Sequence, residues 1–109
     1  MVARDDVEKI TAEQRLSALG IKRPALPEPF GTYVEAVQTG NLLFLSGMLP
    51  TEGRRAKVVG RVGAELDVEA GREAARLAAL NVLAVAKESL QSLDRVTRVV
   101  GLGASVVAS

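Results

Sequence analysis

The chain of 109 residues contains no cysteine and no histidine. Without cysteine, disulfides and thiolate chemistry are excluded. Without histidine, the commonest general base and the commonest metal ligand are missing. A zinc hydrolase or a Ser-His-Asp enzyme built within one chain is therefore excluded. Any catalysis must use carboxylates, Arg, Lys, Tyr, Ser or backbone groups.

Aromatic residues, net charge and long apolar runs are also scarce. The chain has two Phe, one Tyr and no Trp, which argues against a platform for stacking nucleic-acid bases. Its net charge is +1, so no global field attracts nucleic acid or anionic lipid. No apolar run approaches the roughly 20 residues that span a bilayer, and the N-terminal MVARDDVEKI lacks the apolar core of a secretory signal. The sequence therefore predicts a cytoplasmic protein with no membrane partner.

What remains is the composition of one soluble domain, with 48% hydrophobic and 25% charged residues. The first expected element is a helix over residues 5–19, capped by Asp5 or Asp6 and stopped by Gly20. Its apolar stripe is narrow, which is typical of a helix on a surface. Residues 22–31 hold three prolines and are expected to form an extended connector.

A hairpin follows, with strands predicted at Tyr33–Gln38 and Leu42–Ser46 around a tight turn at Gly40-Asn41. The second strand is apolar on both faces, so we expect it to be covered on both sides. Residues 51–66 form a polar loop with Val58–Val59 as a candidate short strand. This loop is basic because it contains Arg54, Arg55, Lys57 and Arg61.

A long helix is predicted from Asp67, a good N-cap, to about Leu90, with a charged stripe of i,i+3 and i,i+4 pairs in its first half. Val96–Val107 is predicted to be a strand buried on both faces, and the glycines within it suggest close approach of a neighbouring backbone. Because a domain seldom ends on such a strand, we expect further chain or a partner to cover it. The pattern predicts an α+β fold with helices on one face of a sheet.

Three segments resemble the Rid (YjgF, or L-PSP) family. They are Gly31-Thr32-Tyr33, the sequence AVQTGNLLFLSGMLP from Ala36 to Pro50, and EAARLAALNVLAVAKESLQSLDRVTRVV from Glu73 to Val100. The TGNLLFLSG core is the most specific part. The N-terminal RLSALGI is similar to a YjgF-like branch that carries a helical extension, here residues 5–20.

The resemblance implies a chorismate mutase-like fold, a homotrimer with clefts between subunits, and cofactor-free hydrolysis of reactive enamines or imines to 2-oxoacids and ammonia. It also implies that residues 1–109 form one incomplete domain. The family continues with a further helix and strands, which carry an arginine that clamps the substrate carboxylate. No position of this sequence matches that arginine. The alternatives are a non-catalytic trimer that binds small molecules, and an RNA-cleaving or translation-inhibiting protein.

The family's ligand-binding positions match only Tyr33, Ser46 and Gly47 in this sequence. Tyr33 is equally well explained as an aromatic residue that packs at the edge of a hairpin. Ser46-Gly47 is also a plausible strand stop or bulge, and both readings are compatible with a cleft.

Two other features are better explained by structure than by function. Asn81, within the apolar part of the long helix, is expected to hydrogen-bond buried backbone. The basic loop is expected to be solvated rather than to bind RNA.

Overall fold

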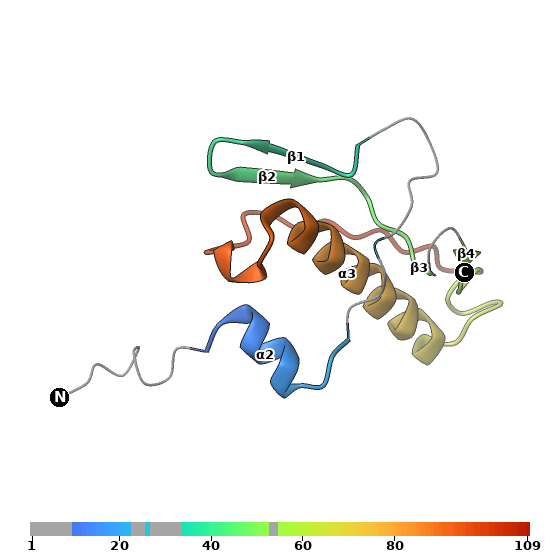
Figure 1. Ribbon diagram of the computed structural model, residues 1–109. Helices are drawn as coiled ribbons and strands as arrows, with labels where there is room; N and C mark the ends of the chain where they lie inside the picture. Colours follow the sequence, from blue (N-terminus) through green and yellow to red (C-terminus); the bar gives the residue numbers. More distant parts are fainter. Residues whose placement is uncertain (1–9, 23–25, 27–33, 53–54) are drawn as a thin grey trace.

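The computed structural model describes residues 10–22, 26, 34–52 and 55–109. Predictions for Tyr33, for Arg54, for most of the proline-rich connector and for residues 5–9 lie outside these ranges. Within them, the long helix α3 (Val68–Leu90) lies between two smaller elements (Figure 1). The hairpin of β1 (Ala36–Thr39) and β2 (Leu42–Leu45) lies along one side, and α2 (Ala12–Ala18) lies on the other.

Helix α2 begins later than predicted. The described residues before Ala12 are not helical, and the N-cap is Thr11 rather than an aspartate. The Gln14 N–H donates to Thr11 Oγ1 over 3.1 Å, while the Thr11 N–H donates to Gln14 Oε1 over 3.0 Å. This capping box satisfies two backbone donors that a helix start would otherwise leave open. The prediction of a helix running unbroken through residues 10 and 11 was therefore wrong.

The end of α2 is as predicted. Gly20 has φ +69°, a left-handed conformation that favours glycine. The Gly20 N–H donates to Ser17 O and the Ile21 N–H donates to Leu16 O, which is the Schellman pattern. No residue of α2 is buried, so the prediction of a surface helix is confirmed for the described residues.

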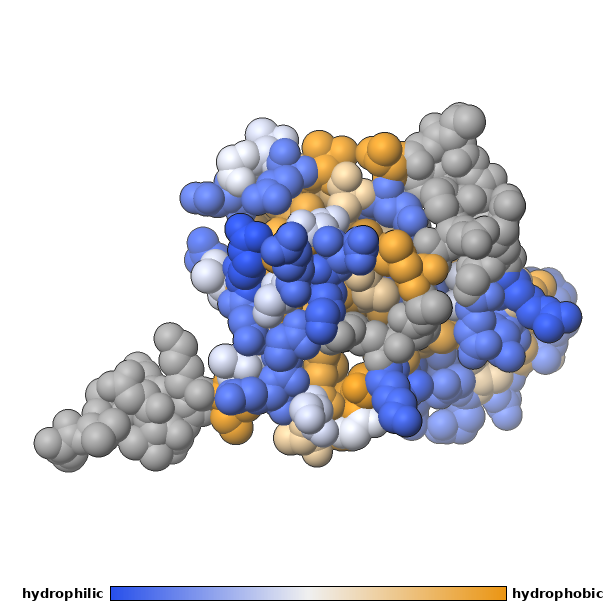
Figure 2. Space-filling model, in the orientation of Figure 1, coloured by the Kyte–Doolittle hydropathy of each residue, from blue (hydrophilic) through white to orange (hydrophobic). Residues whose placement is uncertain are grey.

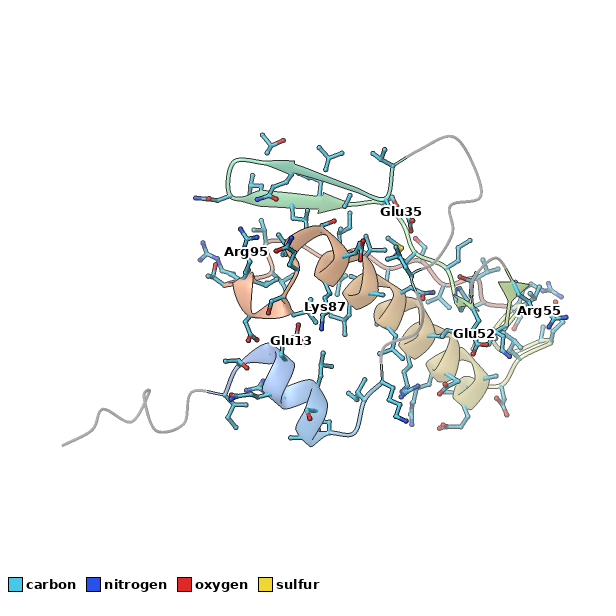
Figure 3. The ribbon with its side chains drawn as sticks, in the orientation of Figure 1. Glu13, Glu35, Glu52, Arg55, Lys87 and Arg95 are labelled. Carbon is cyan, nitrogen blue, oxygen red and sulfur yellow. The ribbon has the colours of Figure 1, made fainter. Side chains whose placement is uncertain are left out.

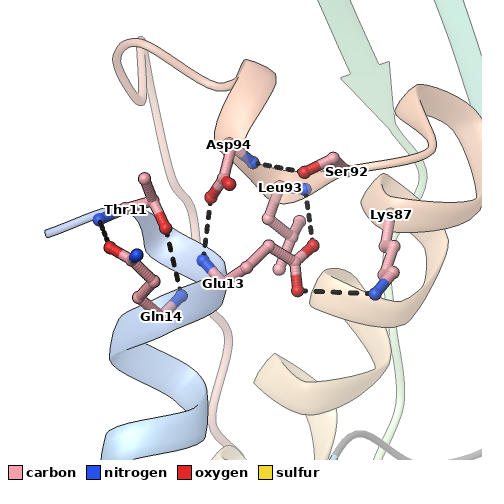
Figure 4. Close-up of polar contacts among 7 residues, drawn as sticks. All are labelled: Thr11, Glu13, Gln14, Lys87, Ser92, Leu93 and Asp94. Atoms are coloured by element: carbon pink, nitrogen blue, oxygen red, sulfur yellow. Dashed lines mark hydrogen bonds and ion pairs between the residues drawn. The ribbon is translucent and has the colours of Figure 1, made fainter.

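Glu13 connects α2 to the rest of the molecule through hydrogen bonds and an ion pair (Figure 4). Its carboxylate accepts from the Leu93 N–H over 2.9 Å and from Lys87 Nζ over 3.4 Å. Its own N–H donates to Asp94 Oδ1 over 2.9 Å. Leu93 and Asp94 belong to the 3₁₀ turn η1 (Leu93–Arg95), so α2 docks against the chain just beyond the end of α3.

The hairpin confirms the predicted strands and turn, with slightly shorter strands. Ala36 pairs with Leu45, and Thr39 pairs with Leu42. The two-residue turn has φ +58° at Gly40 and no positive φ at Asn41, the pattern of a type II′ turn whose twist suits a hairpin.

Only one face of the hairpin is covered within the chain. Leu43 and Leu45 face α3 and are half-buried, whereas Leu42 and Phe44 on the other face remain 46% and 59% exposed. Figure 2 shows apolar side chains at the surface over the hairpin. The expectation of cover on both faces is therefore not met within this single chain.

A second, very short hairpin follows, in which β3 (Thr51–Glu52) pairs with β4 (Arg55–Ala56). The prediction of a strand at Val58–Val59 was wrong, because the pairing occurs closer to Pro50. The Lys57 N–H donates to Pro50 O over 3.0 Å, which ends the ladder there.

Helix α3 confirms the predicted bounds. Its N-cap is Asp67, whose Oδ1 accepts from the Ala70 N–H over 2.8 Å. The charged stripe forms the exposed i,i+3 pairs Glu69–Arg72 and Glu73–Arg76. Most of the buried core lies in the second half of this helix and in η1 and includes Leu80, Ala84, Val85, Ala86, Leu90 and Leu93.

The last segment differs from its prediction. Val96–Val107 is not a strand, and its large apolar side chains are exposed, with Val100 at 80% and Leu102 at 86%. Pairing in this region is limited to a bridge between Ala108 and Val62. A strand needs a ladder of partners, and the described part of the chain offers none here. A Cβ added at Gly101 or Gly103 would meet no atom within 4 Å, so the expected close approach at these glycines is absent.

Candidate functional site

The end of β2 is the candidate site, because two of the three predicted ligand-binding residues lie there. The Ser46 N–H donates to Glu35 O over 2.9 Å, which continues the β1–β2 ladder one step beyond Leu45. Gly47 then leaves the ladder and is exposed. The structure therefore places Ser46 and Gly47 together where a strand reaches the surface, whereas Tyr33 lies outside the described residues.

The Ser46 hydroxyl is the most unusual polar group at this strand end. Its oxygen is buried and has no hydrogen-bond partner among the described residues, a state it shares there with Asn81 Oδ1. A buried hydroxyl without a partner costs free energy, about 1–3 kcal/mol. Such groups are rare in folded proteins and call for an explanation. One explanation is that a bound group supplies the partner.

The backbone at Gly47 is open. A Cβ added there would meet no atom within 4 Å. Packing within the chain therefore does not require glycine at this position. A glycine does leave room for a ligand to approach the main chain closely.

Glu35 is a carboxylate that the sequence analysis did not select. Its backbone is directly across the ladder from Ser46, and side chains of directly opposed residues in an antiparallel pair share one face. Figure 3 shows Glu35 at the end of the hairpin from which β2 continues toward β3. The sequence does contain the information needed to select Glu35. The Gly40-Asn41 turn sets the register of the hairpin, and this register places Glu35 opposite Ser46.

The chain beyond Gly47 is held in place by Asn81 of α3. Asn81 is 1% exposed and its Nδ2 donates to Leu49 O over 2.9 Å and to Thr51 O over 3.0 Å. The prediction that Asn81 hydrogen-bonds buried backbone is confirmed. Its role is to fix the segment between β2 and β3 against the helix, which fixes the position of the strand end.

Two further observations concern metal ligands and membrane-spanning helices. In residues 10–22, 26, 34–52 and 55–109, no three carboxylates gather in a way that could hold a metal ion. No helix among those residues is both long enough and apolar enough to cross a membrane.

We next compared the chain with known protein families and with individual proteins. No protein-family model matches the chain. The chain is similar to Protein TCP17 of Trypanosoma cruzi, with 43% identity over 94 residues that cover 86% of this chain and 59% of that protein.

Among solved structures, one from Shewanella oneidensis MR-1, described as a "putative endoribonuclease", matches with a TM-score of 0.72 and 34% identity over 79% of this chain and 57% of that one. The chain shares this fold. Atu1372 of Agrobacterium tumefaciens, a protein of unknown function, matches with a TM-score of 0.59 and 40% identity over 71% of this chain and 46% of that one.

These matches support the fold prediction at a coarse level. Two helices and small antiparallel sheets are consistent with the YjgF-like fold that the sequence resemblance implies. The chain spans between 46% and 59% of the length of the three proteins.

Proposed function

We propose that the chain belongs to the YjgF/L-PSP (Rid) family and contributes to hydrolysis of reactive enamines or imines at the end of β2. The observation that carries this proposal is the buried, unpartnered Ser46 hydroxyl beside the open backbone of Gly47. The matching TGNLLFLSG residues form the hairpin that presents this pair. The fold shared with the Shewanella protein supports the family assignment alone.

The reaction adds water to an imine carbon and then expels ammonia, so that an imine and one water give a carbonyl compound and one ammonia. In our proposal the Glu35 carboxylate orients the water, accepts its proton and returns that proton to the nitrogen that leaves as ammonia. The Ser46 hydroxyl hydrogen-bonds the substrate, which approaches over Gly47. In the family that this chain resembles, an arginine binds the substrate carboxylate. No position of this sequence matches that arginine, so our proposal requires a cation from elsewhere in the active assembly.

We further propose that the active form is a homotrimer. The outer face of the hairpin supports this, since Val37, Leu42 and Phe44 are each about half exposed, and contiguous apolar surface usually marks an interface. Light scattering that shows a well-folded monomer would contradict the trimer.

A coupled assay tests the proposed reaction. A threonine dehydratase generates the enamine, and release of 2-oxobutyrate is followed with and without the protein. We expect acceleration by the protein, and Ser46→Ala should reduce it roughly 10- to 100-fold because one preorganised hydrogen bond is lost. Glu35→Gln should reduce it at least as much. Ser89→Ala, an exposed serine on α3, is the matched control.

The stability of the same variant separates a functional serine from a structural one. Because the Ser46 hydroxyl has no partner in the part of the chain that the structure describes, Ser46→Ala should leave the free energy of unfolding unchanged or raise it. No acceleration by the unmodified protein would refute the hydrolase proposal. Binding of 2-oxobutyrate without turnover would instead indicate the non-catalytic alternative.

The second candidate function is cleavage of single-stranded RNA, which the description of the Shewanella structure favours. The exposed cations Arg55, Lys57 and Arg61 are the groups that would contact phosphates. The test compares RNA cleavage by the purified protein and by the double variant Arg54→Ala, Arg55→Ala. If both cleave RNA at the same rate, the basic loop is not the cleavage site.

A further inference from the structure

A concave region that shares no residue with the β2 strand end lies beside α3. Helix α3 between Glu73 and Leu80, the segment around the β3–β4 hairpin and Lys22 line a half-open cavity of about 340 Å³. This is near the lower limit of typical small-molecule pockets, roughly 300–1,000 Å³. Its apolar wall consists of Val58, Leu77 and Leu80. A compact apolar group would lose water on entering it.

The rim of this cavity carries charges of both signs with an excess of cations. Lys57 pairs with Glu52 over 3.6 Å, and Arg76 pairs with Glu73 over 3.4 Å. These four side chains are 44–63% exposed, and ion pairs in such positions contribute little, about 0–1 kcal/mol. Each cation can therefore exchange its carboxylate for a ligand at small cost.

Lys22 is the fifth charged group of the rim. Within the part of the chain that the structure describes, its ammonium makes no hydrogen bond or ion pair. It therefore needs no rearrangement to receive an anion. Three cations and two carboxylates leave the cavity with an excess of one positive charge.

The walls of the cavity are fixed by the hydrogen bonds described above. Asn81 ties Thr51, the neighbour of Glu52, to the helical turn that carries Leu80. The Lys57 N–H bond to Pro50 O sets the position from which the lysine side chain leaves. A site whose backbone is fixed in this way loses less entropy when a ligand binds.

We propose that this cavity binds a small organic anion with a compact apolar body. The body lies against Leu77, Leu80 and Val58, and the carboxylate or phosphate is held by Lys22 and Lys57. Arg76 keeps donors free beyond the one nitrogen that pairs with Glu73. The proposal does not depend on the reaction at Ser46, because no residue is common to the two sites.

The test uses three probes of similar size that differ in charge: phenylacetate, phenyl phosphate and phenethylamine. Amide chemical shifts of ¹⁵N-labelled protein are followed during titration. We expect the two anions to change the amide chemical shifts of Val58, Leu77 and Leu80, with dissociation constants of roughly 1 mM. We expect phenethylamine to leave these amides unchanged. A response to phenyl phosphate alone assigns the site to phosphate esters, and a response to both anions assigns it to organic anions in general.

Charge-removal variants test the assignment to the two lysines. Lys22→Gln with Lys57→Gln should raise the dissociation constant about two- to fivefold for each charge removed. Arg98→Gln removes one charge outside the cavity and should change nothing. Both lysines are on the surface, so the double variant should retain its fold, which the unperturbed amides report. The proposal is overturned if no probe shifts these amides at roughly 10 mM, if phenethylamine binds as well as the anions, or if the double variant binds equally well.

Discussion

Replacing Asn81 by alanine should destabilise the protein more than any surface substitution on α3. The Asn81 amide donates to a buried carbonyl, Thr51 O, to a partly buried one, Leu49 O, and more weakly to Thr51 Oγ1 over 3.4 Å. The orientation of the amide is determined by these acceptors, since the opposite orientation would place oxygen against oxygen. Removing the amide takes this donor from the buried Thr51 O, whereas Leu49 O still accepts from the Thr51 N–H over 2.8 Å.

The magnitude follows from burial. A buried acceptor left without a partner costs about 1–3 kcal/mol, which applies to Thr51 O; Leu49 O keeps the Thr51 N–H as a donor and contributes less. A small cavity adds to this. We expect Asn81→Ala to lower the free energy of unfolding by roughly 2–4 kcal/mol, out of the 5–15 kcal/mol typical of a domain. Asn81→Asp, which is nearly isosteric but presents a charged acceptor, should be at least as destabilising at neutral pH.

The assay is urea unfolding followed by far-ultraviolet circular dichroism, because the chain has no Trp and one Tyr, whereas α3 supplies 23 helical residues. Ser89→Ala on the exposed side of α3 is the control and should change the free energy of unfolding by less than about 0.5 kcal/mol. If Asn81→Ala also fell within that margin, or if Asn81→Asp were as stable as the original protein, the assigned hydrogen bonds would not hold the segment between β2 and β3.

Three further substitutions test other parts of the fold. Glu13→Ala should release α2 from η1, which hydrogen exchange would detect as faster exchange in residues 12–18, at a cost of about 1–3 kcal/mol because hydrogen bonds to a charged group are lost. Thr11→Ala should remove the capping box and lower the free energy of unfolding by about 1 kcal/mol; an unchanged urea midpoint would contradict this. Gln91→Gly should raise the free energy of unfolding by roughly 0.5 kcal/mol, since Gln91 has φ +70° and a non-glycine residue is strained there.

The elements predicted correctly from the sequence are those whose cause is local. Helix α3 follows from an N-cap at Asp67 and a long run of good helix formers. The hairpin follows from a two-residue turn containing glycine between apolar strands. The start of α2 is also encoded locally, since Thr11-x-x-Gln14 is the capping-box pattern.

The features that the sequence does not predict depend on contacts between segments that are distant in the chain. Val96–Val107 has the composition of a strand, but in the described chain its ladder partners are missing and only Ala108 forms a bridge. The cavity at Leu77 joins residues from three separate parts of the sequence. Each charged residue of its rim has, by itself, the sequence context of an ordinary solvated side chain. Periodicity and motifs therefore do not predict the cavity.

The two proposals about the hairpin, self-association and hydrolysis, are linked by its register. Val37 and Phe44 are directly opposed, and Glu35 and Ser46 are opposed two residues further along, so alternation places both pairs on the same side of the hairpin, where the Ser46 oxygen itself is covered. A subunit that covers Phe44 therefore also comes close to Ser46. Phe44→Gln should reduce both trimer formation and 2-oxobutyrate release while leaving the Ser46 pairing with Glu35 in place. A fully active monomeric variant would show that the strand-end site works without a neighbouring subunit.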